Sequence, residues 1–276
     1  MSAGGPASGV LPASNEVLWW SQRDNWGHLY LYDLNTGALK RQITSEVLPT
    51  PLSSYTAYAA DAAGAESLAQ HPMLVELATR MKTRIVKRDE APLLACDAPA
   101  SAPVSGVSVI ASAQNSAQQV QWLLRNGAGE VLVLPSLSAP PQRVLIHWTD
   151  DSARRSTLAV AASLLRHVPA EAVYMGILPE STGGESQRPS GVRTLLDARS
   201  EAQAVHGLEM RTELRFGAAA DELQRQLNEA PDQMLILGIA DPGQLGHTFS
   251  ALFASAVPYP MMIVYRPNRE GEGAGE

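Results

Sequence analysis

The 276-residue sequence has one cysteine, Cys96, and a low share of charged residues, 18%. A single cysteine excludes a disulfide within the chain and suits a reducing compartment, so we expect a cytoplasmic protein. Lys and Arg total 21 against 28 Asp and Glu, which gives a formal net charge of −7. Because affinity for nucleic acid depends largely on clustered Lys and Arg, this balance argues against a nucleic-acid partner.

Long hydrophobic runs are also missing. No stretch approaches the roughly 20 apolar residues that a membrane-spanning helix needs. The first twelve residues have neither the basic region nor the apolar region of a signal peptide, so we expect no membrane insertion. Hydrophobic residues nevertheless make up 45% of the chain, which is enough for a folded core. The length favours two ordinary domains over one large domain.

Patterns typical of metal sites and hydrolases are absent. No two histidines have the i, i+4 spacing of a helical metal site, and no Gly-x-Ser-x-Gly nucleophile motif occurs. We therefore expect no metal and no enzymatic activity. The six histidines are His28, His71, His147, His167, His206 and His247.

The sequence pattern of the first half predicts a flexible lead-in over residues 1–15 and a small, degenerate α/β unit over residues 16–137. The unit opens with an aromatic β-hairpin, since two aromatic-rich runs are followed by the turn signal Asn35-Thr-Gly37. Residues 46–62 are expected to be a connector. Beyond it the patterns predict a helix over 64–82, strands at 83–87, 92–96, 107–111 and 131–134, and a helix over 116–125.

The second half, residues 141–267, alternates regularly between apolar runs and helix-length segments. Such alternation predicts an open, parallel, five-stranded sheet with helices on both faces, the flavodoxin-like arrangement. The third strand has polar residues at every second position and should lie at an edge. Residues 268–276 are expected to be a disordered acidic tail. The strands are predicted at 144–148, 172–178, 208–214, 234–237 and 261–265, and the helices at 153–167, 192–206, 218–229 and about 245–254.

A glycine-containing loop, Gly238-Ile-Ala-Asp-Pro-Gly243-Gln-Leu-Gly246, follows the fourth of these strands. Glycines before a helix let a phosphate group approach backbone N–H groups. The same glycines can also serve only to turn the chain. Asp150 and Asp151 can also have either of two roles. They can contact a ligand or cap the helix that follows, and the two roles are compatible.

Particular residues of the second half resemble the universal stress protein family. They are Thr149-Asp-Asp-Ser152 after the first strand, Thr212-Glu-Leu-Arg-Phe-Gly217 leading into Asp221-Glu-Leu, Asp232-Gln-Met-Leu-Ile-Leu-Gly238, and the final Val257-Pro-Tyr-Pro-Met-Met-Ile-Val264. The resemblance implies a nucleotide site at the carboxyl ends of the strands. It would involve Asp150, Asp151, Ile177, Gly238, Gly243, Gly246, His247 and Ser255.

The loop departs from the pattern of the family members that bind ATP. Four residues instead of two separate Gly238 from Gly243, and Phe253-Ala-Ser255 stands near the place of the usual Gly-Ser or Gly-Thr pair. Larger residues there obstruct the approach of phosphate to the backbone. We therefore favour a member of the family that does not depend on ATP, with ATP or another adenine nucleotide as the alternative ligand.

The resemblance implies a non-enzymatic protein of the stress response that senses a nucleotide or another ligand. The alternative is a structural or regulatory module that binds a protein partner and no nucleotide. The resemblance to universal stress proteins also implies a homodimer in which the final strand, Met261–Tyr265, pairs across a two-fold axis.

A second, local resemblance involves the hairpin. Residues 16–45 resemble one blade of the propeller domain found in the dipeptidyl-peptidase IV group. A propeller needs several blades at a regular spacing, and the rest of the chain supplies none. We therefore do not carry the peptidase function over to this chain.

Overall fold

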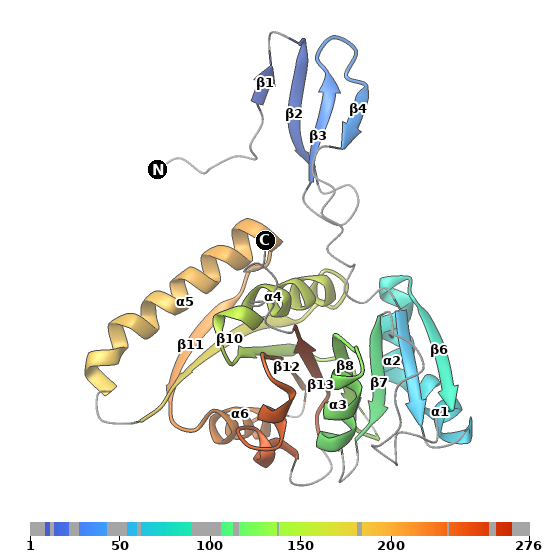
Figure 1. Cartoon of the computed structure of the whole chain (residues 1–276), viewed down its shortest axis with the longest axis vertical. Coiled ribbons are helices and arrows are strands. Elements are labelled where there is room, and N and C mark those ends of the chain that lie inside the picture. The colour runs from blue at the N-terminus through green and yellow to red at the C-terminus, as the bar shows by residue number, and fades with distance from the viewer. Residues whose placement is uncertain are drawn as a thin grey trace, which may run out of the picture. The chain divides into compact units, whose positions relative to one another are not determined.

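The computed structural model of the chain forms two compact units, Met1–Thr50 and Pro51–Glu276 (Figure 1). The division that we expected near residues 137–141 therefore falls inside the second unit. Strands from both sides of that point belong to one sheet, which explains the difference. The structure describes residues 9–11, 14–21, 28–42, 54–59, 62–89, 106–112, 116–136, 138–180, 184–230, 232–253 and 258–266.

The first unit is a four-stranded antiparallel sheet with the strand order β1-β2-β3-β4. It contains the predicted hairpin, in which Trp19 lies opposite Tyr30. The turn after β3 is held by the Asp33 carboxylate, which accepts hydrogen bonds from the backbone N–H groups of Asn35 and Thr36, both at 3.0 Å. One strand falls in the segment that we expected to be a flexible lead-in, so that expectation was wrong there. The strands are β1 (Gly9–Leu11), β2 (Glu16–Ser21), β3 (His28–Asp33) and β4 (Leu39–Gln42).

The second unit contains a nine-stranded sheet with the order β11-β10-β9-β12-β13-β8-β7-β5-β6. Its last five strands in the sequence are mutually parallel, and the first of them lies in the middle. This is the predicted flavodoxin-like arrangement, and the polar strand β11 lies at the edge as expected. These strands are β9 (Arg143–Trp148), β10 (Glu171–Leu178), β11 (Arg211–Phe216), β12 (Gln233–Ile239) and β13 (Met261–Tyr265).

The remaining strands repeat the same order in reduced form. The spatial order β6-β5-β7-β8 matches β10-β9-β12-β13, because in both halves the first strand of the half lies between its second strand and its last but one. Strand β8 pairs antiparallel with β13, with Leu132 opposite Met262 and Val131 opposite Ile263. The outer edge of β13, which we expected to join two copies of the chain, is thus filled by a strand of the same chain. The strands are β5 (Ser54–Ala59), β6 (Arg84–Asp89), β7 (Val107–Ala111) and β8 (Glu130–Leu134).

Two predictions for this first part of the sheet were wrong. Strand β5 lies in the segment 46–62 that we expected to be a connector. The helix predicted over 64–82 is two helices, α1 (Ala62–Ala69) and α2 (Pro72–Met81). Pro72 stands in the first turn of α2, where its missing N–H group costs nothing, whereas inside a longer helix it would remove a hydrogen bond. The strand predicted at 92–96 lies outside the described residues.

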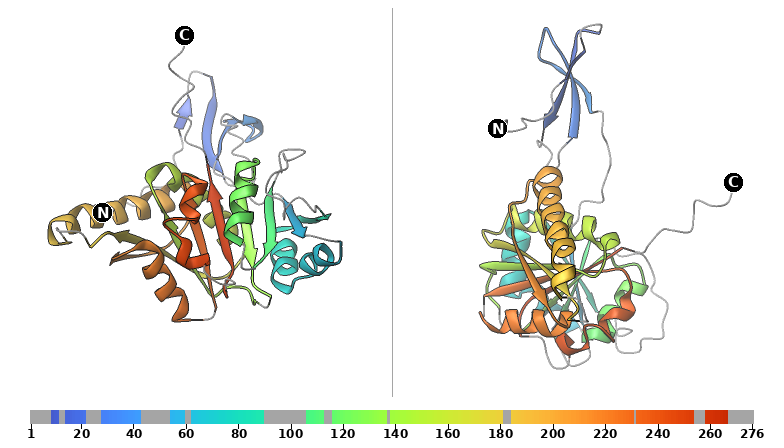
Figure 2. Two further views of the ribbon diagram at one scale, coloured as in Figure 1. Left: turned by 60° about the horizontal axis from the view of Figure 1, so that its bottom comes forward. Right: turned by 90° about the vertical axis from the view of Figure 1, so that its left-hand side faces the viewer.

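Helices cover both faces of the large sheet (Figures 1 and 2). Helices α1, α2, α4 and α5 contribute buried side chains to the core on one face, and α3, α6 and two short 3-10 helices contribute to the core on the other. The helices are α3 (Ser116–Arg125), α4 (Asp151–Leu165), α5 (Gly184–His206) and α6 (Ala219–Asn228), and the 3-10 helices are η2 (Pro242–Leu245) and η3 (Ser250–Phe253).

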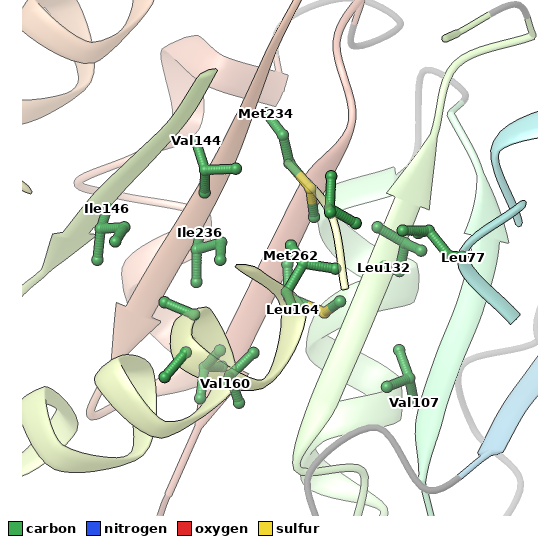
Figure 3. Close-up of a cluster of buried hydrophobic side chains, with 14 of the residues drawn as sticks. Leu77, Val107, Leu132, Val144, Ile146, Val160, Leu164, Met234, Ile236 and Met262 are labelled. Carbon is green, nitrogen blue, oxygen red and sulfur yellow. The ribbon is translucent and has the colours of Figure 1, made fainter. Parts of the chain in front are cut away.

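The core on each face runs across the boundary between the two halves of the sheet. In Figure 3, Leu132 of β8 lies between Met262 of β13 and Leu77 of α2, and Leu164 of α4 lies beside Met262. All four side chains are buried. Burial of this kind is the main stabilising term in folding, so the two halves stabilise each other. None of the helices in the described part of the chain combines the length and apolar character needed to cross a membrane.

Candidate functional site

A cavity of about 260 Å³ opens at the carboxyl ends of β9 and β10. Three of the residues predicted to form a site line it, namely Asp150, Asp151 and Ile177. This is the edge of an open parallel sheet where ligands commonly bind, because the helix that follows each strand leaves its N-terminus there. The other lining residues are His147, Trp148, Thr149, Tyr174, Gly176, Leu178, Gly191, Thr194, Leu195 and Leu214.

Two aromatic side chains form one wall of the cavity. The rings of Trp148 and Tyr174 stack with their centroids 3.9 Å apart and their planes 7° apart. Burial raises the pKa of Tyr174, and the nearby charge of Asp151 acts in the same direction, so its hydroxyl stays protonated. Our sequence reasoning did not predict this pair. The two residues lie on neighbouring strands that are far apart in the sequence, and only the sheet register brings them together.

Asp150 caps the helix α4. Its carboxylate accepts a hydrogen bond from the backbone N–H of Ser152 at 2.8 Å and another from the Ser152 hydroxyl. Burial alone would raise the pKa of Asp150, but these hydrogen bonds outweigh it and hold the pKa below its ordinary value. The carboxylate is thus ionised and already engaged at neutral pH.

Asp151 belongs to a small network of ion pairs. Its carboxylate lies 3.0 Å from Nη1 of Arg154, whose Nε atom lies 2.8 Å from the carboxylate of Glu201. Such a bridge offsets the unfavourable position of an arginine in the first turn of a helix. It joins α4 to α5 beside the cavity.

Gly238 lets α4 pack closely against β12. A Cβ atom at this position would overlap Oγ1 of Thr157 and would lie 3.1 Å from Cβ of Trp148. Thr157 is buried and donates a hydrogen bond to the carbonyl of Ala153 at 2.6 Å, so its side chain is held in place. The carbonyl of Gly238 accepts a hydrogen bond from the N–H of Thr149 at 3.0 Å. This glycine therefore has a structural reason to be present that involves no ligand.

Gly243 is engaged within its own loop. Its backbone N–H donates to the Asp241 carboxylate at 2.9 Å, while the Asp241 N–H lies 3.5 Å from the side-chain oxygen of Gln244. Together these contacts form a capping box around η2. The predicted helix at about 245–254 is instead the pair η2 and η3, since this box and Pro242 start a tight 3-10 turn.

Gly246 continues the same turn, with its N–H donating to the carbonyl of Gly243 at 3.0 Å. A Cβ atom on Gly246 would lie 3.1 Å from Nε2 of Gln121, which belongs to α3. The loop therefore packs against a helix from the other half of the sheet.

The predicted site residues thus separate into two groups. Asp150, Asp151 and Ile177 share the cavity, whereas none of the loop residues Gly238, Gly243, Gly246 and His247 is among the described residues that line it. His247 is exposed, and its carbonyl accepts a hydrogen bond from the Ser250 hydroxyl at 3.2 Å. Ser255 lies outside the described residues. No group of three or more His, Cys, Asp or Glu side chains in the described part of the chain could hold a metal ion.

Two solved structures are similar to the chain at low sequence identity. The chain is similar to a universal stress protein from Archaeoglobus fulgidus, with a TM-score of 0.44 and 13% identity over 71% of this chain and 76% of that one. It is also similar to the universal stress protein UspA from Lactobacillus plantarum, with a TM-score of 0.34 and 11% identity over 46% of this chain and 99% of that one. No model of a known protein family matches the chain. The resemblance of residues 16–45 to a propeller blade finds no support in these comparisons.

Proposed function

We propose that this protein is a non-enzymatic, universal stress protein-like module that acts through a protein partner and does not hold the phosphates of ATP on the loop after β12. The hydrogen bond from the Gly243 N–H to the Asp241 carboxylate carries this proposal. The loop N–H that a phosphate oxygen would use already has an anionic acceptor, which belongs to the protein.

Electrostatics support the same conclusion. A phosphate group near this N–H would stand beside the exposed Asp241 carboxylate, and the two like charges would repel each other. In addition, the carboxylate would have to give up the hydrogen bond that it accepts from this N–H. Gly238 adds to this, because the close contact of its backbone with Thr157 and Trp148 leaves no room for a ligand on that side.

The arrangement of the two halves supports a role as an interaction module. The chain contains an antiparallel junction between β8 and β13, which covers the edge that would otherwise be open for pairing. A partner would therefore bind to other surfaces, and the unit does not need a second copy to complete its sheet.

The second candidate function is ligand sensing in the cavity beside Trp148 and Tyr174. The aromatic wall and the carboxylates of Asp150 and Asp151 favour a neutral or cationic heterocycle. The volume of about 260 Å³ suits a group the size of a single base. Such a ligand would bind through its ring and would not depend on a phosphate group.

Mass spectrometry of the purified protein under native conditions tests both candidates. The proposal expects the mass of the bare polypeptide and no rise in melting temperature with ATP, ADP, AMP or cyclic AMP. A rise with adenosine that is equal to the rise with ATP would support the second candidate instead. Carried-over ATP, or a rise that grows with the number of phosphates, would overturn the proposal.

A further inference from the structure

A larger cavity lies at the opposite end of the same strands, beside the amino ends of β10 and β11. It has a main part of about 520 Å³ and an adjoining part of about 290 Å³. The two parts share four lining residues, so they form one continuous hollow under the C-terminal ends of α4 and α5. The shared residues are Ala170, Ala172, Leu208 and Glu209.

Two opposite charges line the main part without being paired. Arg199 on α5 and Glu209 on the turn before β11 are both exposed, and neither forms an ion pair or a hydrogen bond within the described part of the chain. The other acid there, Glu171, is already neutralised by Arg143 at 3.0 Å and Arg211 at 2.7 Å. Among the described residues, the main part of the cavity thus offers one free cation and one free anion to a ligand.

One ring nitrogen of a buried histidine in the adjoining part also lacks a hydrogen bond. His206 is 3% exposed, and its Nε2 atom has no hydrogen bond among the described residues. Leaving such an atom unpaired costs free energy of folding, which a bound polar group could recover. Burial, together with the charges of Arg166 and Arg155, lowers the pKa of His206 to about 4, so the ring is neutral at pH 7. The ring thus adds no charge to this part of the hollow, whose charged lining residues are Arg166 and the shared Glu209, and Arg166 donates a hydrogen bond to the carbonyl of His206 at 3.2 Å.

Apolar side chains complete the lining. Leu208 and Met210, both largely buried, line the main part, and Ala170 and Ala172 line it from the start of β10 and the residues just before it. A simple anion would pair with Arg199 but would leave Glu209 unpaired and would be repelled by its carboxylate. A simple amine would pair with Glu209 but would leave Arg199 unpaired and would be repelled by its guanidinium group. The lining therefore matches a molecule that carries both charges next to an apolar group.

We propose that this cavity binds a free amino acid with an apolar side chain. The ligand carboxylate pairs with Arg199, its ammonium group pairs with Glu209, and its side chain packs on Leu208 and Met210. A main part of about 520 Å³ is within the range of small-molecule sites. The site is separate from the cavity at the carboxyl ends of the strands, so it stands or falls independently of the proposed function.

Calorimetric titration of the full chain with leucine, methionine and phenylalanine tests the proposal. We expect at least one of them to bind, and its amide, which lacks the carboxylate, and its deaminated acid, which lacks the ammonium group, to bind about tenfold more weakly or not at all. No binding of any of the three amino acids at millimolar concentration would overturn the proposal. Equal binding of the amide or of the deaminated acid would overturn it too.

Matched variants locate the site. Arg199→Gln and Glu209→Gln should each weaken binding about tenfold, since each removes one charge-assisted hydrogen bond. Arg193→Gln, on the same helix but outside the cavity lining, is the control and should bind as the unaltered protein does. Both cavity residues are exposed, so circular dichroism should show an unchanged fold. Undiminished binding by both cavity variants would place the amino acid elsewhere and contradict the proposal.

Discussion

The carboxylate of Asp241 accepts a hydrogen bond from the backbone N–H of Gly243, with a distance of 2.9 Å between N and Oδ1. This contact gives the loop after β12 its shape, because it starts the 3-10 helix η2 at Pro242 and turns the chain toward α3. It also places a negative charge where the resemblance to stress proteins implied a phosphate.

We predict that Asp241→Ala lowers the stability of the protein by about 1 kcal/mol, the usual cost of removing a capping side chain. The midpoint of urea unfolding, followed by circular dichroism, measures the effect. Asp197→Ala on the exposed face of α5 removes a carboxylate that caps nothing and should change the midpoint by much less. Equal effects of the two substitutions would show that the Asp241 contact contributes nothing specific.

We predict that Gly238→Ala destabilises the protein by about 1 to 3 kcal/mol, because the added methyl group overlaps Thr157 and forces α4 away from β12. In a Thr157→Ala background the same substitution should cost less, since the obstructing oxygen is gone. Unfolding free energies of the two single variants and the double variant form a cycle that measures this coupling. A coupling of zero would mean that the glycine is present for another reason.

The junction between β8 and β13 predicts a crosslink within one chain. Leu132 and Met262 lie opposite each other on the same face of the sheet. With Cys96 replaced by serine, cysteines at these two positions should form a disulfide under mild oxidation, because directly opposed residues bring their Cβ atoms close. The product should run as a monomer on a denaturing, non-reducing gel. A crosslinked dimer would contradict the pairing within the chain, and the variant with the Leu132 cysteine alone is the control.

His206 predicts a loss of stability in mild acid. Its pKa is lowered from 6.5 to about 4 by burial and by the charges of Arg166 and Arg155. Between these values an unfolded chain binds a proton at this ring and the folded chain does not, so stability falls as the pH is lowered from 6.5 towards 4. His206→Gln should make this fall shallower, as measured by unfolding at several pH values, with His247→Gln as the exposed control. An unchanged pH profile in His206→Gln would contradict the assignment.

Strands made of continuous apolar runs could be predicted from the sequence almost to the residue. Val107–Ala111 and Met261–Tyr265 have the observed bounds, because turn residues or proline precede each of them. Strand β5, with the sequence Ser-Tyr-Thr-Ala-Tyr-Ala, could not be recognised in the same way. Its Ser54 and Thr56 are buried only because neighbouring strands enclose them, and such pairing leaves no local pattern.

The candidate site shows the same limit. Asp150 could be predicted because an aspartate before a helix is a local signal, and the structure places it both at the helix cap and at the cavity. The stack of Trp148 on Tyr174 depends on the register between β9 and β10, which the sequence does not reveal. The contact of Gly243 with Asp241 could be predicted in part. Asp-Pro-Gly is a turn signal in which the aspartate side chain accepts a hydrogen bond from the backbone N–H two residues later.

Calorimetric titration of the unaltered protein and of Asp241→Ala with Mg-ATP tests the central claim most directly. The account predicts no measurable heat of binding for the unaltered protein. It predicts that Asp241→Ala, which frees the Gly243 N–H and removes the repelling charge, binds ATP at least weakly, whereas Asp197→Ala does not. Saturable binding of ATP by the unaltered protein would contradict it.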